Sequence, residues 1–309
     1  MAFIDAHRER FGVEPICRVL TEHGCKIAPN TYWAHRKRPP SARAVRDECL
    51  KGEIARVHAD NLSVYGADKV WAQLNREGTR VARCTVERLM RQMGLSGARR
   101  GRSFKVTTRH DERQRRPDDL VGRQFRAPAP NRLWVADLTY VKTQGGWVYA
   151  AFIIDVFSRM VVGWQISNSL RADLAIDALE MAIWNRTRSG QVLDGLVHHS
   201  DRGVQYLCVR YSERLDANDI VASVGSRGDS YDNAMAESFN SLFKWELIYP
   251  QGPWRGLDDV EFATLGYIDW FNHRRLHGEV TDDNAYTTPA EFEAAYYRQP
   301  APALAAVTR

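Results

Sequence analysis

The chain contains 309 residues, of which 44% are hydrophobic and 26% are charged. This length predicts two compact units with a joining segment, and the hydrophobic fraction is sufficient for real cores. No apolar run approaches the roughly 18 residues of a transmembrane helix, and residues 1–30 contain neither an apolar signal region nor a small-residue cleavage site. We therefore expect a soluble, cytoplasmic protein.

The net charge of +5 is divided unequally along the chain. Residues 1–116 contain 25 Lys and Arg against 13 Asp and Glu, a net charge of +12, whereas residues 117–309 contain 18 against 25, a net charge of −7. The basic first part predicts a polyanionic partner, and the acidic second part indicates a need for cations such as metal ions. The five cysteines are odd in number and form no CxxC pair, which argues against a disulfide framework and a zinc ribbon.

The first part of the chain is expected to be helical. Residues 1–45 are expected to form an N-terminal helical segment that ends at the stretch RKRPPSAR, because two prolines and a basic cluster break a helix. Residues 46–97 are expected to form a small all-α domain, with helices over residues 47–61, 65–78 and 81–95.

The helix expected over residues 81–95 combines an apolar stripe with a polar face. Thr85 is expected to cap its N-terminus. The stripe consists of Val86, Leu89, Met90 and Met93, and the free face consists of Thr85, Glu87, Arg88, Arg91 and Gln92. Two helices joined by a short turn suit a helix-turn-helix that contacts DNA, and a plain helical hairpin with a solvated face is the alternative. The basic surplus favours DNA contact, with Arg88 and Arg91 as candidate contacts.

Residues 98–123 are expected to form a basic linker. Residues 98–116 contain eight basic and two acidic residues with almost no apolar periodicity. Such a segment can follow a phosphate backbone and gain affinity through counterion release. A solvated tether is the alternative, and the two are compatible. The candidate DNA contacts in this segment are Arg99, Arg100 and Arg102.

Residues 124–295 are expected to form an α/β domain, followed by a tail over residues 296–309. Strands are expected over residues 133–141, 147–156, 160–167, 195–200 and 219–225, and helices over residues 172–184 and 232–247. The first three strands have short connections that are typical of an antiparallel meander. Strands that then alternate with helices indicate a mixed five-stranded sheet flanked by helices.

Three aspartates lie within or at the ends of expected strands, where the secondary structure alone does not call for a carboxylate. Asp137 lies in the middle of a strand that is largely apolar on both faces, although aspartate is disfavoured in strands and costly to bury. Asp201 follows the strand GLVHHS, at the end where α/β sheets place ligand groups, although a turn or cap role would also explain it. Asp155 ends another strand and is expected to pair locally with Ser158 or Arg159 rather than bind a metal.

Glu237 lies on an expected helix whose polar face combines a carboxylate with amide, hydroxyl and ammonium groups. At about 100° per residue, Asn233, Asn240, Ser241 and Lys244 fall on the side of Glu237, and Met235, Phe239 and Leu242 gather on the opposite side. A solvated surface helix would look similar. The preceding loop SVGSRGDSYDNA is rich in glycine and small polar residues and leads directly onto the polar face.

Three carboxylates are sufficient for a pair of magnesium ions, since Mg²⁺ takes oxygen ligands and keeps several waters. Two such ions roughly 3.5 to 4 Å apart can activate a nucleophilic oxygen and stabilise the leaving oxygen of an in-line displacement at phosphorus. His198, His199 and Arg202, which flank Asp201, are then expected to approach phosphate. An acidic catalytic half would also need a basic half, because carboxylates alone repel DNA.

The stretches LWVADLTYV, VHHSDRGVQY and GDSYDNAMAESFNSLFKWEL closely resemble the catalytic core shared by retroviral integrases and DDE transposases. Thirty-five residues separate Asp201 from Glu237, the spacing for which the D,D(35)E family is named, and Lys244 matches a further basic position on the same helix. The stretches DVFSRMVVGW, VERLMRQMGL, YIDWFNHRRLH and TPAEFE are similar to the second-frame transposase of two-frame bacterial insertion sequences. The resemblance covers essentially the entire chain.

The resemblance implies an RNase H-like fold in a bacterial, nucleoid-associated transposase. It implies two Mg²⁺ (or Mn²⁺) ions held by Asp137, Asp201 and Glu237, with Lys244, Asn240 and Asn233 as DNA contacts. The implied reaction is hydrolysis at the element's ends to free a 3′-hydroxyl, followed by attack of that hydroxyl on another phosphodiester. The implied partners are DNA, further copies of the chain on DNA, and the first-frame helix-turn-helix and coiled-coil product, alone or as a fusion.

Two alternatives remain open at this point: a catalytically silent DNA-binding regulator derived from an element, and a simple RNase H-like nuclease. The stretch GEVTDDNAYTTPAEFE departs from the common pattern of the family between the histidine and the final helix. Its TPAE sequence still forms a capping box with proline at the first helical position, so that helix is expected to form.

Overall fold

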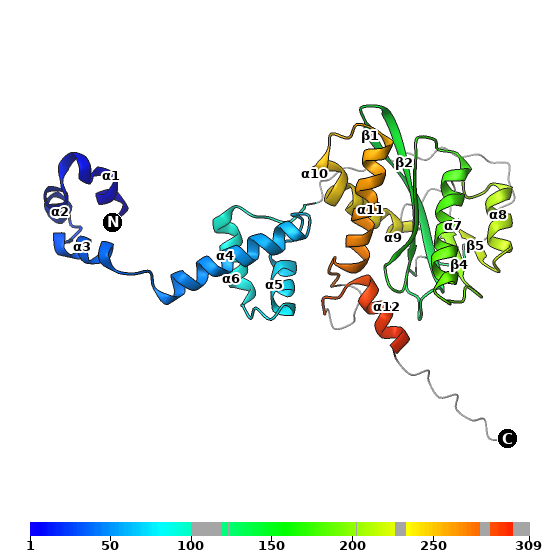
Figure 1. Ribbon diagram of the computed structural model, residues 1–309, viewed down its shortest axis with the longest axis horizontal. Coiled ribbons are helices and arrows are strands. Elements are labelled where there is room, and N and C mark those ends of the chain that lie inside the picture. The colour runs from blue at the N-terminus through cyan, green and yellow to red at the C-terminus, as the bar shows by residue number, and fades with distance from the viewer. Residues whose placement is uncertain (100–118, 123, 202, 226–232, 279–284, 299–309) are drawn as a thin grey trace, which may run out of the picture. The chain divides into compact units, whose positions relative to one another are not determined.

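The computed structural model describes residues 1–99, 119–122, 124–201, 203–225, 233–278 and 285–298 (Figure 1). The chain divides into two compact units, residues 1–53 and 54–309. The expected domain boundaries after residues 45, 97, 123 and 295 remain predictions. Among the described residues, no helix has the length and apolar character needed to cross a membrane.

The first unit contains more structure than the single helical segment expected for residues 1–45. Three helices, α1 (Ala2–Phe11), α2 (Val13–Glu22) and α3 (Pro29–Lys37), precede the break at the prolines. Helix α4 (Ala42–Asp60) then begins five residues before the expected start at residue 47. The reason is local, because the Ser41 hydroxyl accepts a hydrogen bond from the Ala44 backbone N–H (3.2 Å) and so caps the helix.

Helices α5 (Ala67–Arg76) and α6 (Arg83–Met93) follow α4, which confirms the expected all-α region. The apolar stripe of α6 is buried at Val86, Leu89 and Met90. Thr85 does not cap the helix: α6 begins two residues earlier, with Ala82 at the N-cap, so Thr85 lies within the first turn. Gly94 ends the helix in the left-handed conformation, with φ of 69°, which suits glycine.

The second unit contains the expected mixed sheet of five strands (Figure 1). The strands are β1 (Leu133–Thr143), β2 (Gly146–Asp155), β3 (Val161–Ser167), β4 (Val197–Ser200) and β5 (Val221–Val224), in the spatial order β3-β2-β1-β4-β5. The meander β1–β2–β3 is antiparallel, whereas β4 pairs parallel to β1 and β5 parallel to β4. The central strand is therefore β1, which carries Asp137.

One face of the sheet packs on helix α7 (Ala172–Arg188), and the contact is close at Gly163 on β3. A Cβ atom at Gly163 would lie 2.2 Å from the carbonyl oxygen of Ala178, so only glycine allows this approach. Helix α8 (Val209–Asp216) lies between β4 and β5 in the chain and was not expected. It has only eight residues and buries Tyr211 and Leu215 in the same core as α7.

The opposite face of the sheet is covered by helix α9 (Ala234–Phe243), which continues through a π-helical turn (Lys244–Ile248) into α10 (Tyr249–Gln251). Phe152 on β2 lies against Phe239 and Phe243 of α9, with both ring-centroid distances at 4.9 Å. Helix α11 (Leu257–His273) packs beside α9 through Phe271, whose ring centroid lies 4.9 Å from that of Phe239.

The C-terminal helix α12 (Pro289–Arg298) begins with the expected capping box. The Thr288 hydroxyl accepts from the Glu291 backbone N–H (3.2 Å), and the Glu291 carboxylate accepts from the Thr288 backbone N–H (3.1 Å). The reciprocal pair satisfies two backbone donors that the first turn leaves without intrahelical partners.

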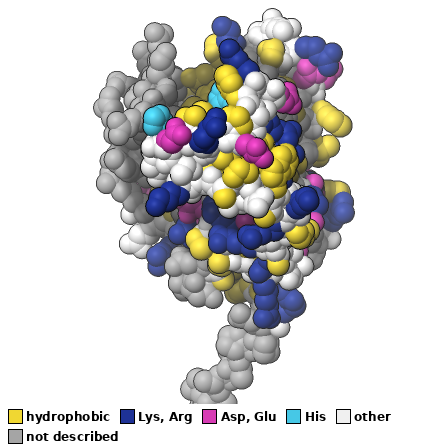
Figure 2. Space-filling model, turned by 90° about the vertical axis from the view of Figure 1, so that its left-hand side faces the viewer, with side chains coloured by type: hydrophobic (Ala, Val, Ile, Leu, Met, Phe, Trp, Pro, Cys, Tyr) yellow, Lys and Arg dark blue, Asp and Glu magenta, His cyan; other side chains and the backbone are white. Residues whose placement is uncertain are grey.

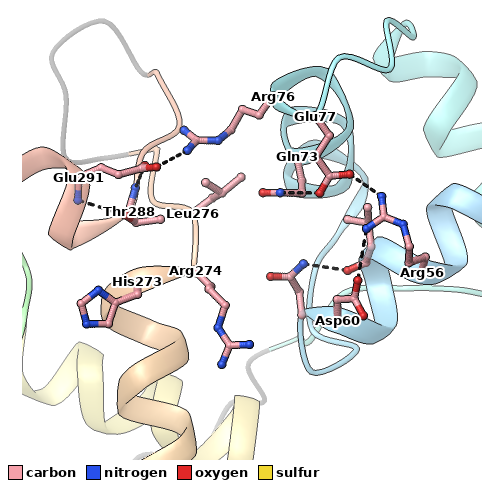
Figure 3. Close-up of a pocket in the computed structure, with 12 residues that line it drawn as sticks. Arg56, Asp60, Gln73, Arg76, Glu77, His273, Arg274, Leu276, Thr288 and Glu291 are labelled. Carbon is pink, nitrogen blue, oxygen red and sulfur yellow. Dashed lines mark hydrogen bonds and ion pairs between the residues drawn. The ribbon is translucent and has the colours of Figure 1, made fainter.

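The helix-turn-helix contacts the end of α11 through buried polar bonds within the second unit. The Tyr65 hydroxyl donates to the Arg274 carbonyl (3.2 Å) and accepts from the Leu276 backbone N–H (2.7 Å). The Trp270 indole N–H donates to the Asn61 side-chain oxygen (3.1 Å). A cleft of about 460 Å³ opens beside these contacts, and the ion pair of Arg76 with Glu291 (2.6 Å) spans it (Figure 3).

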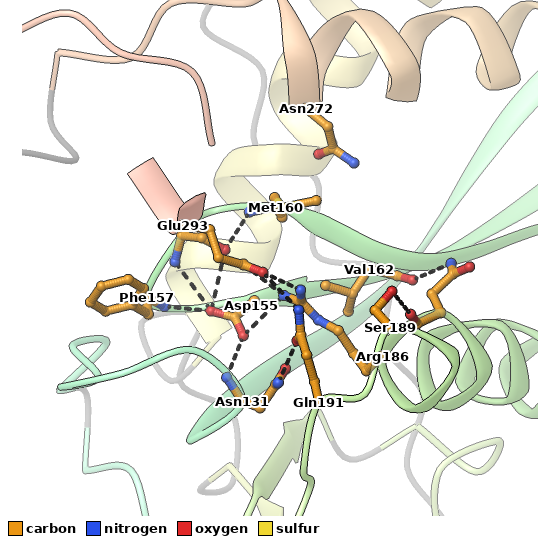
Figure 4. Close-up of polar contacts among 12 residues, drawn as sticks. Asn131, Asp155, Phe157, Met160, Val162, Arg186, Ser189, Gln191, Asn272 and Glu293 are labelled. Carbon is orange, nitrogen blue, oxygen red and sulfur yellow. Dashed lines mark hydrogen bonds and ion pairs between the residues drawn. The ribbon is translucent and has the colours of Figure 1, made fainter. Parts of the chain in front are cut away.

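A buried ion-pair cluster joins α12 to the sheet and to α7 (Figure 4). Arg186 of α7 donates to Glu293 of α12 (2.8 Å) and to Asp155 at the end of β2 (3.4 Å). Asp155 also accepts from the backbone N–H groups of Ser158 (3.1 Å) and Asn131 (2.7 Å). The expected local pairing of Asp155 with Ser158 is thus present, whereas the long-range pairing with Arg186 was not expected.

Substitution of Arg186→Met is expected to destabilise the second unit strongly, because it leaves two carboxylates buried without their cation. Removing one member of a buried ion pair typically costs about 3–5 kcal/mol. Arg210→Ala is the control, since the Arg210–Asp173 pair (2.6 Å) is exposed and such pairs contribute about 1 kcal/mol or less. Urea unfolding of both variants checks the prediction, and equal losses of stability would contradict it.

Candidate active site

Asp137 lies near the middle of β1 and opposite Phe152 of β2. One oxygen of its carboxylate accepts from the Leu138 backbone N–H (2.8 Å), and the other accepts from the Asn240 side-chain amide of α9 (2.9 Å). The side chain is therefore fixed by its own strand and by the helix that carries Glu237.

Asp201 follows β4 directly, and the parallel pairing of β1 with β4 brings it to the neighbourhood of Asp137. Ala136 and Ser200 are partners in the register, so the two aspartates are the next residues along adjacent strands. The Asp201 carboxylate accepts from the Gly203 backbone N–H (2.9 Å), which orients it in a tight turn.

Glu237 is exposed in the first turn of α9, on the side away from the packed phenylalanines. Phe239 and Phe243 fix the rotation of the helix against Phe152, and the Glu237 carboxylate interacts electrostatically with Asp137 and Asp201. The strand pairing thus brings the two aspartates to neighbouring positions, and the assignment of all three carboxylates to one metal site remains a prediction.

The three carboxylates interact electrostatically with one another. Burial, and then repulsion from Asp201 and Glu237, raises the pKa of Asp137 well above its ordinary value. Burial and repulsion from Asp201 also raise the pKa of Glu237. Each carboxylate therefore disfavours ionisation of its neighbours, and a bound cation would remove this repulsion.

The donor set fits magnesium, since it consists of carboxylate oxygens with part of their surface open to solvent. Within the described ranges, however, no group of three His, Cys, Asp or Glu side chains is arranged so as to hold a metal ion directly. The three carboxylates interact electrostatically without forming a closed coordination group.

Lys244 lies where α9 passes into the π-helical turn, and it is half-buried beside the aspartates. Its ammonium lies 4.5 Å from the ring centroid of Tyr140, in a cation–π contact. Burial lowers the pKa of Lys244, and attraction to Asp137 acts in the opposite direction. The cation therefore interacts with Asp137, and its contact with DNA remains a prediction.

The expectation that Asn233 and Asn240 lie on a free polar face is wrong. Helix α9 buries Ala236, Phe239, Asn240 and Phe243. Asn240 therefore lies on the packed side of the helix. Asn233 donates to the Ala136 carbonyl (2.9 Å), in the strand of Asp137. Both asparagines are thus engaged in holding α9 on β1, and their contact with DNA remains a prediction.

The two histidines beside Asp201 do not face the site. His198 and His199 are buried on opposite faces of β4, where they contact the hydroxyls of Tyr211 (3.0 Å) and Ser223 (2.9 Å). Burial lowers the pKa of His198 to about 4, so it is neutral near pH 7. The expectation that these histidines approach phosphate is wrong, because the sheet is covered on both faces at this strand.

The remaining candidate DNA contacts are basic residues of the first part of the chain. Arg91 is exposed on α6 and pairs with Glu87 (3.0 Å), Arg88 is half-buried on the same helix, and Arg99 is exposed. Arg100, Arg102 and Arg202 lie outside the described residues. The DNA contacts of this group remain predictions.

One supporting cluster was not expected from the sequence. Glu246, in the π-helical turn after Lys244, is buried and accepts from the Arg275 guanidinium (2.6 Å) and the Tyr267 hydroxyl (3.0 Å). The cluster joins the turn beside Lys244 to the segment after α11 that contacts the helix-turn-helix. In the sequence, only the adjacent basic residues in FNHRRLH pointed to a partner for this buried glutamate.

The raised pKa of Asp137 predicts a pH-dependent cost in metal-free protein. A carboxyl whose pKa is higher in the folded than in the unfolded state contributes stability at low pH that is lost as pH rises through the folded pKa. Asp137→Asn removes this cost, so in chelator it is expected to unfold at higher urea concentration than wild type at neutral pH, with a smaller difference near pH 4.

Added Mg²⁺ is expected to make wild-type protein more stable to urea than Asp137→Asn. At about 100 times its Kd, a ligand that binds only folded protein stabilises it by about 2.7 kcal/mol, and Asp137→Asn should lose most of this gain. Asp216→Asn, at an exposed position, is the control and should behave as wild type. Equal stabilisation of all three proteins by Mg²⁺ would show that the ion does not bind at Asp137.

Several parts of the chain match known family models. Residues 127–230 and 218–281 match two models described as an integrase core domain, and residues 45–103 match a model described as an HTH-like domain. Among solved structures, the simian T-cell lymphotropic virus intasome in complex with PP2A regulatory subunit B56 gamma is similar with a TM-score of 0.46 and 17% identity, over 83% of this chain and 80% of that chain. The HTLV-2 integrase catalytic core domain in complex with magnesium is similar with a TM-score of 0.41 and 18% identity, over 54% and 98%.

Sequence relatives extend the similarity over nearly the whole chain. The putative transposase for insertion sequence element IS986/IS6110 of Mycobacterium tuberculosis is 53% identical over 88% of this chain and 97% of the relative. The transposase for insertion sequence element IS629 of Shigella sonnei is 49% identical over 96% of both chains. The transposase InsF for insertion sequence IS3A of Escherichia coli is 32% identical over 80% of this chain and 83% of the relative. The chain therefore belongs to the family of insertion-sequence transposases with an integrase core domain.

Proposed function

We propose that the chain catalyses Mg²⁺-dependent (or Mn²⁺-dependent) cleavage and strand transfer of DNA at the ends of an insertion sequence. The observation that carries the proposal is the pairing of β1 with β4, which brings Asp137 and Asp201 to neighbouring positions, together with the electrostatic interaction of both with Glu237. Carboxylates that repel one another in a partly open site favour the binding of cations. The DNA backbone is a substrate that brings further negative charge, which the same cations would neutralise.

These three residues would hold two divalent ions. Such a pair, when bound, supplies activation of an attacking oxygen and stabilisation of a leaving oxygen at phosphorus. The chain's own residues orient the site: Asn240 holds the Asp137 carboxylate, and Gly203 holds that of Asp201. The same site can serve both steps of the proposed reaction, in which water first attacks to free a 3′-hydroxyl and that hydroxyl then attacks a second phosphodiester.

Substrate binding is assigned to the basic groups around this acidic site. Lys244 is a point charge suited to a phosphate next to the carboxylates, and Arg88 and Arg91 of α6 are proposed to contact DNA further away. The proposal places the chain on DNA in the cytoplasm, as an oligomer of itself. It also includes the first-frame product as a partner, alone or as a fusion.

Asp137→Asn, Asp201→Asn and Glu237→Gln are each expected to abolish Mg²⁺-dependent nicking and joining, with a loss of at least about 10³-fold, while DNA binding persists. Each change removes a metal-ligand charge and preserves side-chain size. Gel assays with duplexes that carry the element's ends measure both products, and Asp216→Asn is the matched control.

The outcomes of this assay separate the alternatives. Retained cleavage in any one of the three variants would mean that the acidic site is assigned to the wrong residues. If wild-type protein binds the DNA without any Mg²⁺-dependent product, the silent regulator is correct. If it cuts without joining, the simple nuclease is correct.

Lys244→Ala is expected to weaken binding of element-end DNA and to reduce the slope of log affinity against log salt by about 0.9, the loss of one phosphate contact. Lys244→Arg should restore the salt slope because it keeps the charge. Fluorescence anisotropy at several salt concentrations measures the slope. A Lys244→Ala protein with unchanged affinity and slope would remove Lys244 from the DNA interface.

A further inference from the structure

We propose that α2 and α3 form a second helix-turn-helix, in which α3 binds duplex DNA. This segment precedes residues 45–103, which match the HTH-like model, and residues 127–281, which match the integrase core models. The inference rests on the proposed function in one respect, since DNA is the polyanion that the protein is proposed to process. It goes beyond that function by giving the N-terminal unit a DNA-binding surface of its own.

The N-terminal unit has the architecture of a small DNA-binding domain. Its three helices share one apolar core, which consists of Ile4, Val13, Ile16, Cys17 and Tyr32, with Leu20 and Ile27 packed against it. Helices α2 and α3 are consecutive and are joined by residues 23–28. A third helix packed against such a pair is the arrangement in which the second helix of the pair can enter the major groove.

The turn between α2 and α3 is held by specific bonds. The Thr21 hydroxyl donates to the Cys17 carbonyl (2.8 Å) and accepts from the Ile27 backbone N–H (3.3 Å). The Cys25 backbone N–H donates to the Leu20 carbonyl (2.8 Å). The turn therefore fixes the direction in which α3 leaves α2, as recognition of a rigid groove requires.

The rotation of α3 is fixed by Tyr32, which is fully buried. Its hydroxyl donates to Asp5 of α1 (2.7 Å), and Arg36, one turn later, donates to the same Asp5 carboxylate (3.5 Å). This side of α3 is therefore occupied by protein. The opposite side is available to a partner.

The outward side of α3 carries side chains that suit a DNA groove. At about 100° per residue, Asn30, Ala34 and Lys37 lie about 140° to 200° from Tyr32, and all three are exposed. An asparagine amide can pair with the edge of adenine, and alanine allows close approach and contact with a thymine methyl group. Lys37 and the following Arg38 are exposed and have no ion-pair partner among the described residues.

The positive charge around the outward side of α3 favours DNA as its partner. Residues 23–46 contain six Lys and Arg and no Asp or Glu, and the basic residues are exposed. Figure 2 shows many Lys and Arg side chains at the surface in the view that it presents. The free side of α3 combines a small residue, an amide and cations without ion-pair partners among the described residues. Such a surface is complementary to DNA, which offers phosphates to the cations and base edges to the amide.

The test is the affinity of the full-length chain for a fluorescein-labelled, mixed-sequence DNA duplex, measured by anisotropy at several salt concentrations. The double variant Lys37→Ala/Arg38→Ala is expected to bind on the order of tenfold more weakly, and its log–log salt slope should fall by about 1.8, the loss of two phosphate contacts. The matched control is Arg8→Ala/Arg10→Ala, which removes two cations from α1 of the same unit and should leave the slope unchanged.

A second variant tests the surface without reducing the number of cations. Ala34→Glu places a carboxylate on the outward side of α3, at an exposed position where glutamate is a good helix former. It is expected to weaken binding on the order of tenfold as well. Circular dichroism and thermal unfolding are expected to be those of wild type for all three variants.

The outcomes separate this inference from the proposed function. If wild-type protein binds and cleaves DNA, and Lys37→Ala/Arg38→Ala and Ala34→Glu bind as wild type does, the inference is overturned and the function stands. If the variants lose affinity while wild-type protein yields no Mg²⁺-dependent product, the inference stands and the proposed function falls. Equal losses in the α1 control would also overturn the inference, because they would indicate a general charge effect.

Discussion

Repulsion among three carboxylates is the constraint on which the rest of the structure depends. Burial, followed by repulsion from Asp201 and Glu237, raises the pKa of Asp137, and burial with repulsion from Asp201 raises that of Glu237, so ionising these groups costs free energy in the absence of a cation. Local sequence preference would not place an aspartate in the middle of a central strand. The surrounding structure therefore has to fix the strands and the helix that carry these groups.

Those contacts form two layers around the carboxylates. The parallel pairing of β1 with β4 fixes the two aspartates, and the aromatic packing of α9 on Phe152 fixes Glu237. Further out, Glu246 and Arg275 hold the π-helical turn after Lys244, and the Asp155–Arg186–Glu293 cluster holds α12 on the core. Buried ion pairs contribute little net stability but are costly to break, so they favour one arrangement over looser alternatives.

The sequence was informative where periodicity or spacing is strong. The five strands, the apolar stripe of α6 and the capping box of α12 all follow from local patterns, and the three acidic positions remain a prediction from the spacing of the family. Helix starts were less predictable, because Ser41 caps α4 and Ala82 begins α6, which single-residue preferences do not distinguish from nearby candidates. Helix α8 was missed since eight residues with two buried side chains give a weak pattern.

The side chains around the site were the least predictable feature. A helical projection places Asn240 beside Glu237 but cannot show that Phe243 and Ala236 pack inward, which turns the amide toward Asp137. The same limit applies to His198 and His199, whose burial depends on helices and strands on both faces of β4. Long-range pairs such as Arg186 with Glu293 are separated by more than one hundred residues and leave no local signal.

The central claim is that the three carboxylates hold divalent cations against a DNA phosphodiester. Anomalous diffraction from crystals of the chain with DNA and Mn²⁺ tests this claim most directly. We expect manganese peaks about 3.5 to 4 Å apart between Asp137, Asp201 and Glu237, next to the scissile phosphate. Manganese bound elsewhere, with these carboxylates directed away from one another in a DNA-bound complex, would contradict the account.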